Sequence, residues 1–375
     1  MTSFKKIVAT ALLAMGLASI GASVASAVTN LVIHSATVPS SVANGDFQHA
    51  VAYGNGHWVS IAEDGTSLKS SDGKTWGSGG LTGLTVSYDV TYGNGRFVAV
   101  GDTKVSVSTD NGETWQISLP QNAFSWGSVA YGNGHFIALD YDDCGGRSIV
   151  STDGITWTEV DTNLGYKCWT DIAYGNGTFV AISTDSVVAV SVDDGLTWNR
   201  VADADEFNFQ PRTVAYGNGR FMILGDDEQG NVLAGTSTNG NLWDVHNFTS
   251  GALTTGLFRE VAFGDGKWIA AAASPLGTNS IIVSTDNGLT WQVVEAATAG
   301  YLYTDAEFGN GTFVLSGQFT GSTPLVGRNQ HGLSWLQTSA GSLANTGSNS
   351  NVLWLLALVG FAAVGVGVQL KRFTS

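Results

Sequence analysis

The stretch DIAYGNGTFVAISTDSVVAVSVDDGLTWNRV, residues 171–201, decides the fold because it contains one complete structural repeat. Asn176 and Gly177 tolerate the positive φ angles of a type I′ turn, so this pair predicts a tight β-hairpin. A third strand is expected at residues 187–191, which are mostly β-branched or apolar, and a fourth opens at Trp198. The stretch therefore predicts four short antiparallel strands.

The hairpin turn of this repeat recurs along the whole chain. Its sequence is YGNG in five repeats, starting at Tyr53, Tyr92, Tyr131, Tyr174 and Tyr216. It is FGDG at Phe263 and FGNG at Phe308. Successive turns start 39 to 47 residues apart, and a period near 40 residues with strand-like contents is typical of propeller blades. The sequence predicts an all-β fold, a seven-bladed β-propeller of four-stranded antiparallel blades over residues 49–339.

A second motif, SxDxGxTW, precedes the fourth strand of most repeats. It occupies residues 108–115, 191–198 and 284–291, and one-residue-shorter forms occupy 70–76 and 151–157. The motif resembles the Asp box, or BNR repeat, of sialidase-like propellers, and the repeats are also similar to those of photosystem II assembly-type propellers. We expect its Asp to cap backbone amides of the turn and its Trp to pack between turns, a structural role.

The motif weakens toward the end of the chain. The fifth repeat has Asn239 and Leu242 in place of the Asp and Thr, and the seventh retains little before Trp335. Residues 28–48 precede the first repeat, and within them residues 31–38 alternate like a fourth strand. This segment is expected to pair with the outer part of blade seven and close the ring, with residues 335–339 as the alternative occupant.

The two ends of the chain resemble targeting segments. Residues 1–27 have a basic start, an apolar run and small residues before Ala27, which predicts a signal peptide cut after Ala27. Residues 352–370 form an uncharged apolar stretch of transmembrane length, followed by a basic cytoplasmic tail at 371–375. Both features predict that the intervening chain is extracellular.

A linker at residues 340–351 carries the pentapeptide Leu343-Ala344-Asn345-Thr346-Gly347. Followed by an apolar helix and a basic tail, it resembles the LPxTG-like sorting signal of sortase-anchored surface proteins, in an LAxTG variant. That resemblance implies a sortase and cell wall peptidoglycan as partners, with cleavage after Thr346. The alternative is a retained helix that anchors the chain in the membrane.

Charge and cysteine content limit the partners further. The chain has 31 acidic and 16 basic residues, a formal net charge of −15, which repels nucleic acid, so no nucleic-acid partner is expected. Cys144 and Cys168 fall in loops of adjacent blades on the same predicted face, and we expect a disulfide between them. The histidines show no metal-ligand spacing, so no metal and no cofactor are expected.

Irregular loops gather on one face of the predicted ring, opposite the YGNG turns. Candidate ligand-binding residues are the aromatic side chains near the blade entrances: Tyr88, Trp126, Tyr166, Trp169, Phe258 and Tyr303. Carboxylates enter the same strands at Asp89, Asp171, Glu260 and Asp305, where they either face the channel or bond to neighbouring backbone amides. The aromatic rings either contact a ligand or fill the space between blades.

These features favour a non-catalytic cell-surface propeller that binds a glycan or protein ligand on its variable-loop face. A structural or assembly protein of the cell envelope is the first alternative. A glycoside hydrolase of sialidase-like type is the second, since such chemistry needs only two suitably spaced carboxylates. The Arg-Ile-Pro motif that the sialidase resemblance implies does not occur, and no catalytic residue is assigned.

Overall fold

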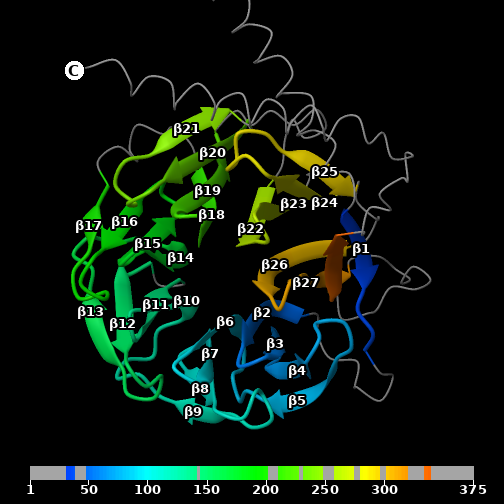
Figure 1. Ribbon diagram of the computed structural model, residues 1–375. Helices are drawn as coiled ribbons and strands as arrows, with labels where there is room; N and C mark the ends of the chain where they lie inside the picture. The colour runs from blue at the N-terminus through cyan, green and yellow to red at the C-terminus, as the bar shows by residue number, and fades with distance from the viewer. Residues whose placement is uncertain are drawn as a thin grey trace, which may run out of the picture. The chain divides into compact units, whose positions relative to one another are not determined.

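The computed structural model describes residues 31–38, 48–141, 144–201, 210–227, 231–247, 257–273, 279–295, 301–319 and 333–338. The chain divides into two compact units, Met1–Gln337 and Thr338–Ser375, and the ring of sheets lies in the first. Its strands form seven four-stranded antiparallel sheets around a central axis, as Figure 1 shows. The predicted all-β, seven-bladed propeller is therefore confirmed.

The first three blades follow one another without interruption. Blade one contains β2 (Gln48–Gly54), β3 (His57–Ala62), β4 (Thr66–Ser70) and β5 (Gly77–Leu81). Blade two contains β6 (Ser87–Gly93), β7 (Arg96–Gly101), β8 (Val105–Ser108) and β9 (Gln116–Ser118). Blade three contains β10 (Trp126–Gly132), β11 (His135–Asp140), β12 (Arg147–Ser151) and β13 (Thr158–Asp161). In each blade the first strand is the innermost (Figure 1).

The next three blades repeat this order. Blade four contains β14 (Trp169–Gly175), β15 (Thr178–Ser183), β16 (Val188–Ser191) and β17 (Asn199–Arg200). Blade five contains β18 (Gln210–Gly217), β19 (Arg220–Asp226), β20 (Val232–Ser237) and β21 (Asp244–Asn247). Blade six contains β22 (Leu257–Gly264), β23 (Lys267–Ala273), β24 (Asn279–Ser284) and β25 (Gln292–Glu295).

Blade seven combines the last three strands of the propeller with its first strand. Its strand order from the axis outward is β26 (Tyr301–Gly309), β27 (Thr312–Phe319), β28 (Ser334–Thr338) and β1 (Leu31–Ser35). The expected closure of the ring by the N-terminal segment is confirmed. The alternative occupant, around Trp335, forms the third strand instead.

The physical reason for this difference lies in the sequence before Trp335. Residues 328 and 330 are Arg and Gln where the complete motif has Ser and Asp, so the groups that bond the turn are missing. Trp335 pairs with Val314 in the ladder, and its ring stacks on His34 of β1 with centroids 4.4 Å apart. The Lys74 ammonium lies 4.3 Å from the same ring, which ties blade seven to blade one.

The YGNG turns have the predicted type I′ geometry. Asn55 and Gly56 both have positive φ, 51° and 74°, and the equivalent pair has positive φ in all seven blades. The first glycine of the tetrapeptide has a different function. A Cβ on Gly132 would lie 2.0 Å from Tyr174 Cγ in the next blade, and the same conflict recurs at every blade junction, including Gly309 with Tyr53. Each YGNG therefore links its blade to both neighbours.

The SxDxGxTW turns are held by hydrogen bonds from serine and aspartate. In blade one the Ser70 hydroxyl accepts from the Gly73 amide at 2.9 Å, and Asp72 Oδ1 accepts from the Lys74 and Thr75 amides, each at 2.8 Å. The Trp76 indole donates to the Gly73 carbonyl at 3.0 Å. Aspartates in these turns cap backbone, which is the expected structural role.

The amide hydrogen bonds also change the acidity of these aspartates. The bond from the Thr156 amide is the largest influence on Asp153, and it holds the pKa of that carboxyl below its ordinary value. In blade five, Asn239 replaces the aspartate and accepts from the Asn241 and Leu242 amides, so the same turn forms without a charge.

The hydrophobic core lies between blades. Within the described residues, seven clusters of buried apolar side chains each join two adjacent blades. The cluster between blades one and two contains Val59, Ile61 and Phe97, all fully buried. Burying a side chain of this size contributes roughly 1.5–3 kcal/mol. The packed blades therefore form a rigid wall around the central axis of the ring.

Candidate functional site

A cavity of about 810 Å³ lies on the ring axis. Side chains of the innermost strands line it, those of β2, β6, β10, β14, β18, β22 and β26. Tyr141 and Thr184, which follow the second strands of blades three and four, also line it, so this axial cavity extends toward the variable-loop side. Tyr131, Tyr174 and Tyr216 line it near the YGNG turns, which defines its other end.

A β-bulge sits at the same place in every innermost strand. The register shifts between Ser87 and Asp89 in β6, between Trp169 and Asp171 in β14, and at the equivalent pair in the other five blades. Regular alternation would send neighbouring residues to opposite faces, but a bulge re-aims one of them. Tyr88 and Asp89 consequently both line the axial cavity.

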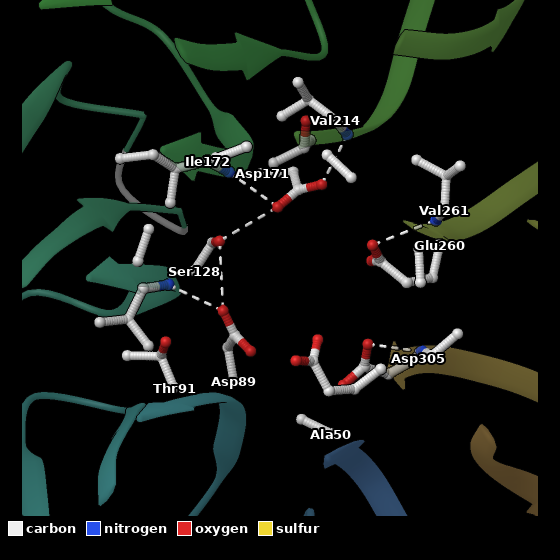
Figure 2. Close-up of a pocket in the computed structure, with 18 of the residues that line it drawn as sticks. Ala50, Asp89, Thr91, Ser128, Asp171, Ile172, Val214, Glu260, Val261 and Asp305 are labelled. Carbon is white, nitrogen blue, oxygen red and sulfur yellow. Dashed lines mark hydrogen bonds between the residues drawn. The ribbon is translucent and has the colours of Figure 1, made fainter. Parts of the chain in front are cut away.

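Four carboxylates point toward the centre of this cavity from different parts of the ring. Figure 2 shows Asp89, Asp171, Glu260 and Asp305, which come from blades two, four, six and seven. They are the carboxylates that the sequence placed at the blade entrances. The sequence left two alternatives open, facing the channel or bonding to backbone amides, and both are true of this group.

Three of these carboxylates bridge neighbouring blades. Asp171 Oδ1 accepts from the Ile172 amide of its own strand, and Oδ2 accepts from the Val214 amide of blade five, both at 2.7 Å (Figure 2). Asp89 repeats the arrangement with the Val90 amide at 2.7 Å and the Val129 amide of blade three at 2.8 Å. Each aspartate thereby fixes the spacing of two innermost strands.

Asp305 makes the same bridge across the seam between the last and first blades. Its Oδ1 accepts from the Ala306 amide and its Oδ2 from the Val51 amide of blade one, both at 2.6 Å. Between blades five and six the bridging acceptor is Thr213, whose hydroxyl oxygen accepts from the Val261 amide at 3.1 Å. The hydroxyl donates in turn to Glu260 Oε1 at 3.2 Å.

Enclosure raises the pKa of every one of these carboxyls. Burial is the largest cause throughout, and it outweighs the amide hydrogen bonds that favour the charged form. The pKa rises to about 6 for Asp89 and to about 7 for Asp171 and Asp305. Burial, together with the negative charges of Asp171 and Asp305, raises the pKa of Glu260 well above its ordinary value.

Glu307 is a fifth carboxyl in the axial cavity, and the sequence analysis did not single it out. Burial, followed by the charges of Asp305 and Asp89, raises its pKa to about 8. The signal was present in the sequence: the equivalent positions of the other blades hold Ala52, Thr91, Ala130, Ala173, Ala215 and Ala262. Since small residues satisfy the packing at this position in the other blades, packing does not explain a glutamate there.

The structure divides the six aromatic candidates into two groups. Trp126, Trp169, Phe258 and Tyr303 are between 0% and 8% exposed and pack in the clusters between blades. Of these four, Phe258 also lines the axial cavity. These rings therefore mainly fill the space between blades, which was the second of the two interpretations of the pattern.

The other two candidates reach solvent or the cavity. Tyr88 lines the axial cavity, and its hydroxyl donates to Asp102 Oδ1 at 3.0 Å. Tyr141, which the sequence analysis passed over, lies beside Tyr88 with ring centroids 5.8 Å apart. Tyr166 is 83% exposed and does not line the cavity. Tyr88 and Tyr141 thus form an aromatic edge at the loop side of the axial cavity.

A disulfide fixes the loops next to this edge. Cys144 and Cys168 are bonded, which confirms the predicted link between blades three and four. Beside it, Gly145 and Lys167 form a parallel β-bridge. The Arg147 guanidinium lies 4.1 Å from the centre of the Phe124 ring. These contacts make the loop side rigid at this point.

No group of three or more metal-binding side chains in the described part of the chain is arranged to hold a metal ion. Among the same residues, no helix has the length and hydropathy needed to cross a membrane. The predicted signal peptide, the sorting motif and the apolar stretch at 352–370 all lie outside the described residues.

Solved structures with the same fold include binding proteins and an enzyme. A structure described as YCF48 bound to D1 peptide matches with a TM-score of 0.63 and 15% identity, over 84% of this chain and 97% of that one. Virginiamycin B lyase from Staphylococcus aureus matches with a TM-score of 0.62 and 11% identity, over 82% and 98%.

A third match is the WD40 β-propeller domain of Doa1, with a TM-score of 0.55 and 13% identity over 79% of this chain and 94% of that one. No family model matches the chain, and no curated protein is similar enough to count as a relative. At these identities the likeness shows a shared propeller fold, and a fold of this kind hosts both binding and catalysis.

Proposed function

We propose that this protein is a non-catalytic propeller that binds a ligand at the loop-side mouth of the axial cavity. The observation that carries the proposal is the cavity itself, a preformed space of about 810 Å³ in a rigid wall, with an aromatic edge and inward-pointing carboxylates. Preformed cavities with few convergent polar groups are the usual form of binding sites. A peptide is the favoured ligand, because a propeller of the same fold is described bound to one.

The test is a binding screen with the full chain in a mild nonionic detergent. Peptide and glycan arrays are probed in parallel with the wild-type protein and with a Tyr88→Ala, Tyr141→Ala double variant. Peptide ligands that bind the wild type, and bind the variant at least about tenfold more weakly, support the proposal. Glycan ligands alone would redirect it to carbohydrate. A chain that binds neither contradicts it.

Catalysis is the second candidate, and one observation favours it. Carboxyls with pKa values of about 6 to 8 stand together in one cavity, and general acids at neutral pH need such values. A hydrolase of sialidase-like type would lose its activity when Glu307 is changed to Gln. Turnover of a panel of aryl glycosides by the wild type would establish this function in place of simple binding.

We further propose that the protein works outside the cell and is attached by its C-terminal end. The supports are the signal-like residues 1–27 and the LANTG sequence before an apolar stretch. Thr346→Ala is expected to move the protein from the wall fraction released by muramidase to the membrane fraction. Equal distribution of both forms would favour the membrane anchor.

A further inference from the structure

The axial cavity holds more negative than positive groups. Its lining includes the titratable or charged side chains His49, Tyr88, Asp89, Tyr131, Tyr141, Asp171, Tyr174, Arg212, Tyr216, Arg259, Glu260, Asp305 and Glu307. Arg212 is already paired with Asp226 outside the carboxylate group, at 2.7 Å. In the described part of the chain, no ion pair joins any of the five carboxyls to an arginine or lysine. Arg259 is the other cationic side chain in the lining, so the five carboxyls outnumber the two arginines.

The five carboxyls are not equivalent, because only some of them have structural partners. Asp89, Asp171 and Asp305 each accept two backbone amides, so the spacing of the blades explains their presence. Glu307 receives no hydrogen bond from any described residue, although it lines the axial cavity and burial raises its pKa. An enclosed carboxyl without a partner costs stability, and nothing in the described part of the fold offsets that cost.

A metal ion does not account for this arrangement. Calcium needs six to eight oxygens within about 2.3–2.6 Å of one point, and no described group of acidic side chains converges in that way. An organic cation has different requirements. Its N–H groups reach carboxylates over about 2.7–2.9 Å in several directions, and its attraction to further carboxylates decreases slowly with distance.

The end of the cavity near the YGNG turns adds a second kind of partner, for the stem that carries such a cation. The rings of Tyr131, Tyr174 and Tyr216 line it there. The apolar stem of a basic side chain packs well against aromatic side chains. Carboxylates around the wall and aromatic rings at the end are complementary to a cation on an extended, partly apolar stem.

We propose that the axial cavity binds one guanidinium or ammonium group, the end of a basic side chain, with Glu307 as its principal contact. The inference rests on the proposed binding function, since it names the chemistry of the group that a peptide ligand inserts. Glu307 gains its missing partner when the cavity is occupied. The aspartates keep their amide bonds and contribute through their charge.

The pH dependence of binding follows from the same groups. At about pH 5 the cavity carboxyls are largely protonated, and they ionise as the pH rises through about 6 to 8. His49 also lines the cavity, and burial lowers its pKa. Arg212 and Arg259 are the cationic side chains of the lining. A cation should therefore bind more tightly as the pH rises from about 5 to 8.

The experiment uses the full chain in nonionic detergent and two small probes of the same shape. Propylguanidinium carries the charge, and propylurea is its neutral counterpart. Titration calorimetry is expected to detect propylguanidinium only, with affinity increasing by about tenfold or more between pH 5 and pH 8. Glu307→Gln should weaken binding about tenfold at pH 8. Asp244→Asn, at an exposed carboxyl on β21, removes the same charge and should leave binding unchanged.

The opposite results would overturn the inference. These are equal binding of both probes, binding that Glu307→Gln leaves intact, or binding of Ca²⁺ in place of propylguanidinium. They remain separate from failure of the proposed function. If the peptide array yields ligands without basic residues and propylguanidinium does not bind, the binding function holds and the cation site fails. If propylguanidinium binds and the arrays yield nothing, the reverse is true.

Discussion

At the residue scale, two glycines of the YGNG turn have distinct physical roles. Gly134 lies in the turn with φ of 85°, and no atom lies within 4 Å of the place that a Cβ would take, so its role is conformational. Gly132 has no such φ, and its role is space: the Tyr174 ring of the next blade occupies the place of a Cβ. The tetrapeptide therefore encodes a hairpin and a blade junction at once.

Gly132→Ala is expected to lower the free energy of unfolding by about 1–3 kcal/mol, because a Cβ overlaps the Tyr174 ring and forces the junction apart. Gly77→Ala is the matched control, since Gly77 also lies in a strand and has open space around its Cα. It should change stability by no more than about 0.5 kcal/mol. Chemical denaturation measures both, and equal losses would show that the junction tolerates the overlap.

Sequence reasoning succeeded at this scale where the signal was local. Asn176-Gly177 specifies its own turn, so the hairpin could be identified without knowledge of its neighbours. The direction in which side chains at the blade entrances point could not be read from the local sequence. Trp169 and Asp171 are two apart in sequence, yet the bulge between them sends one into the wall and the other to the axial cavity. Glu307 was missed because its environment is made by several blades.

At the element scale, strands and loops are joined in pairs across blade boundaries. The disulfide ties the loop after β11 to the loop before β14, and so connects blades three and four on the variable-loop side. Blade seven needs β1 as its outermost strand, a pairing between opposite ends of the ring. The strand count of each repeat was predictable, but the assignment of Trp335 was not, because it depends on that distant partner.

Replacing both cysteines with alanine is expected to destabilise the protein by about 3 kcal/mol. The bond closes a segment with a sequence separation of 24 residues, and its loss restores conformational freedom to the unfolded chain. The denaturation midpoint of the double variant should equal that of wild-type protein treated with a reducing agent. A double variant as stable as the oxidised wild type would show that the β-bridge and the Arg147 contacts hold the loops unaided.

At the scale of the whole molecule, acidity is distributed in two zones with opposite behaviour. The capping aspartates of the turns, such as Asp153, have lowered pKa values, and the carboxyls of the axial cavity have raised ones. The first zone contributes stability that is present above the unfolded pKa and lost as the pH falls. In the second zone the folded state binds more protons than the unfolded state, so stability decreases as the pH rises.

Thermal unfolding should therefore be most resistant at about pH 4, and the midpoint should fall as the pH rises from about 4 to 8. Glu307→Gln should flatten the alkaline side of this profile, because it removes a group whose pKa is about 8. Asp244→Asn serves again as the charge-matched control. Differential scanning calorimetry across this range is the measurement, and a profile that rises toward pH 8 would contradict the expectation.

The closure of blade seven also imposes an order on synthesis. Strand β1 leaves the ribosome first among the strands and its neighbour β28 last, because they occupy the two ends of the ring. At about 5–20 residues per second, the roughly 300 residues between them take on the order of 15–60 seconds to appear. During that time β1 has no partner strand to pair with. Its short length of five residues limits mispairing with other strands.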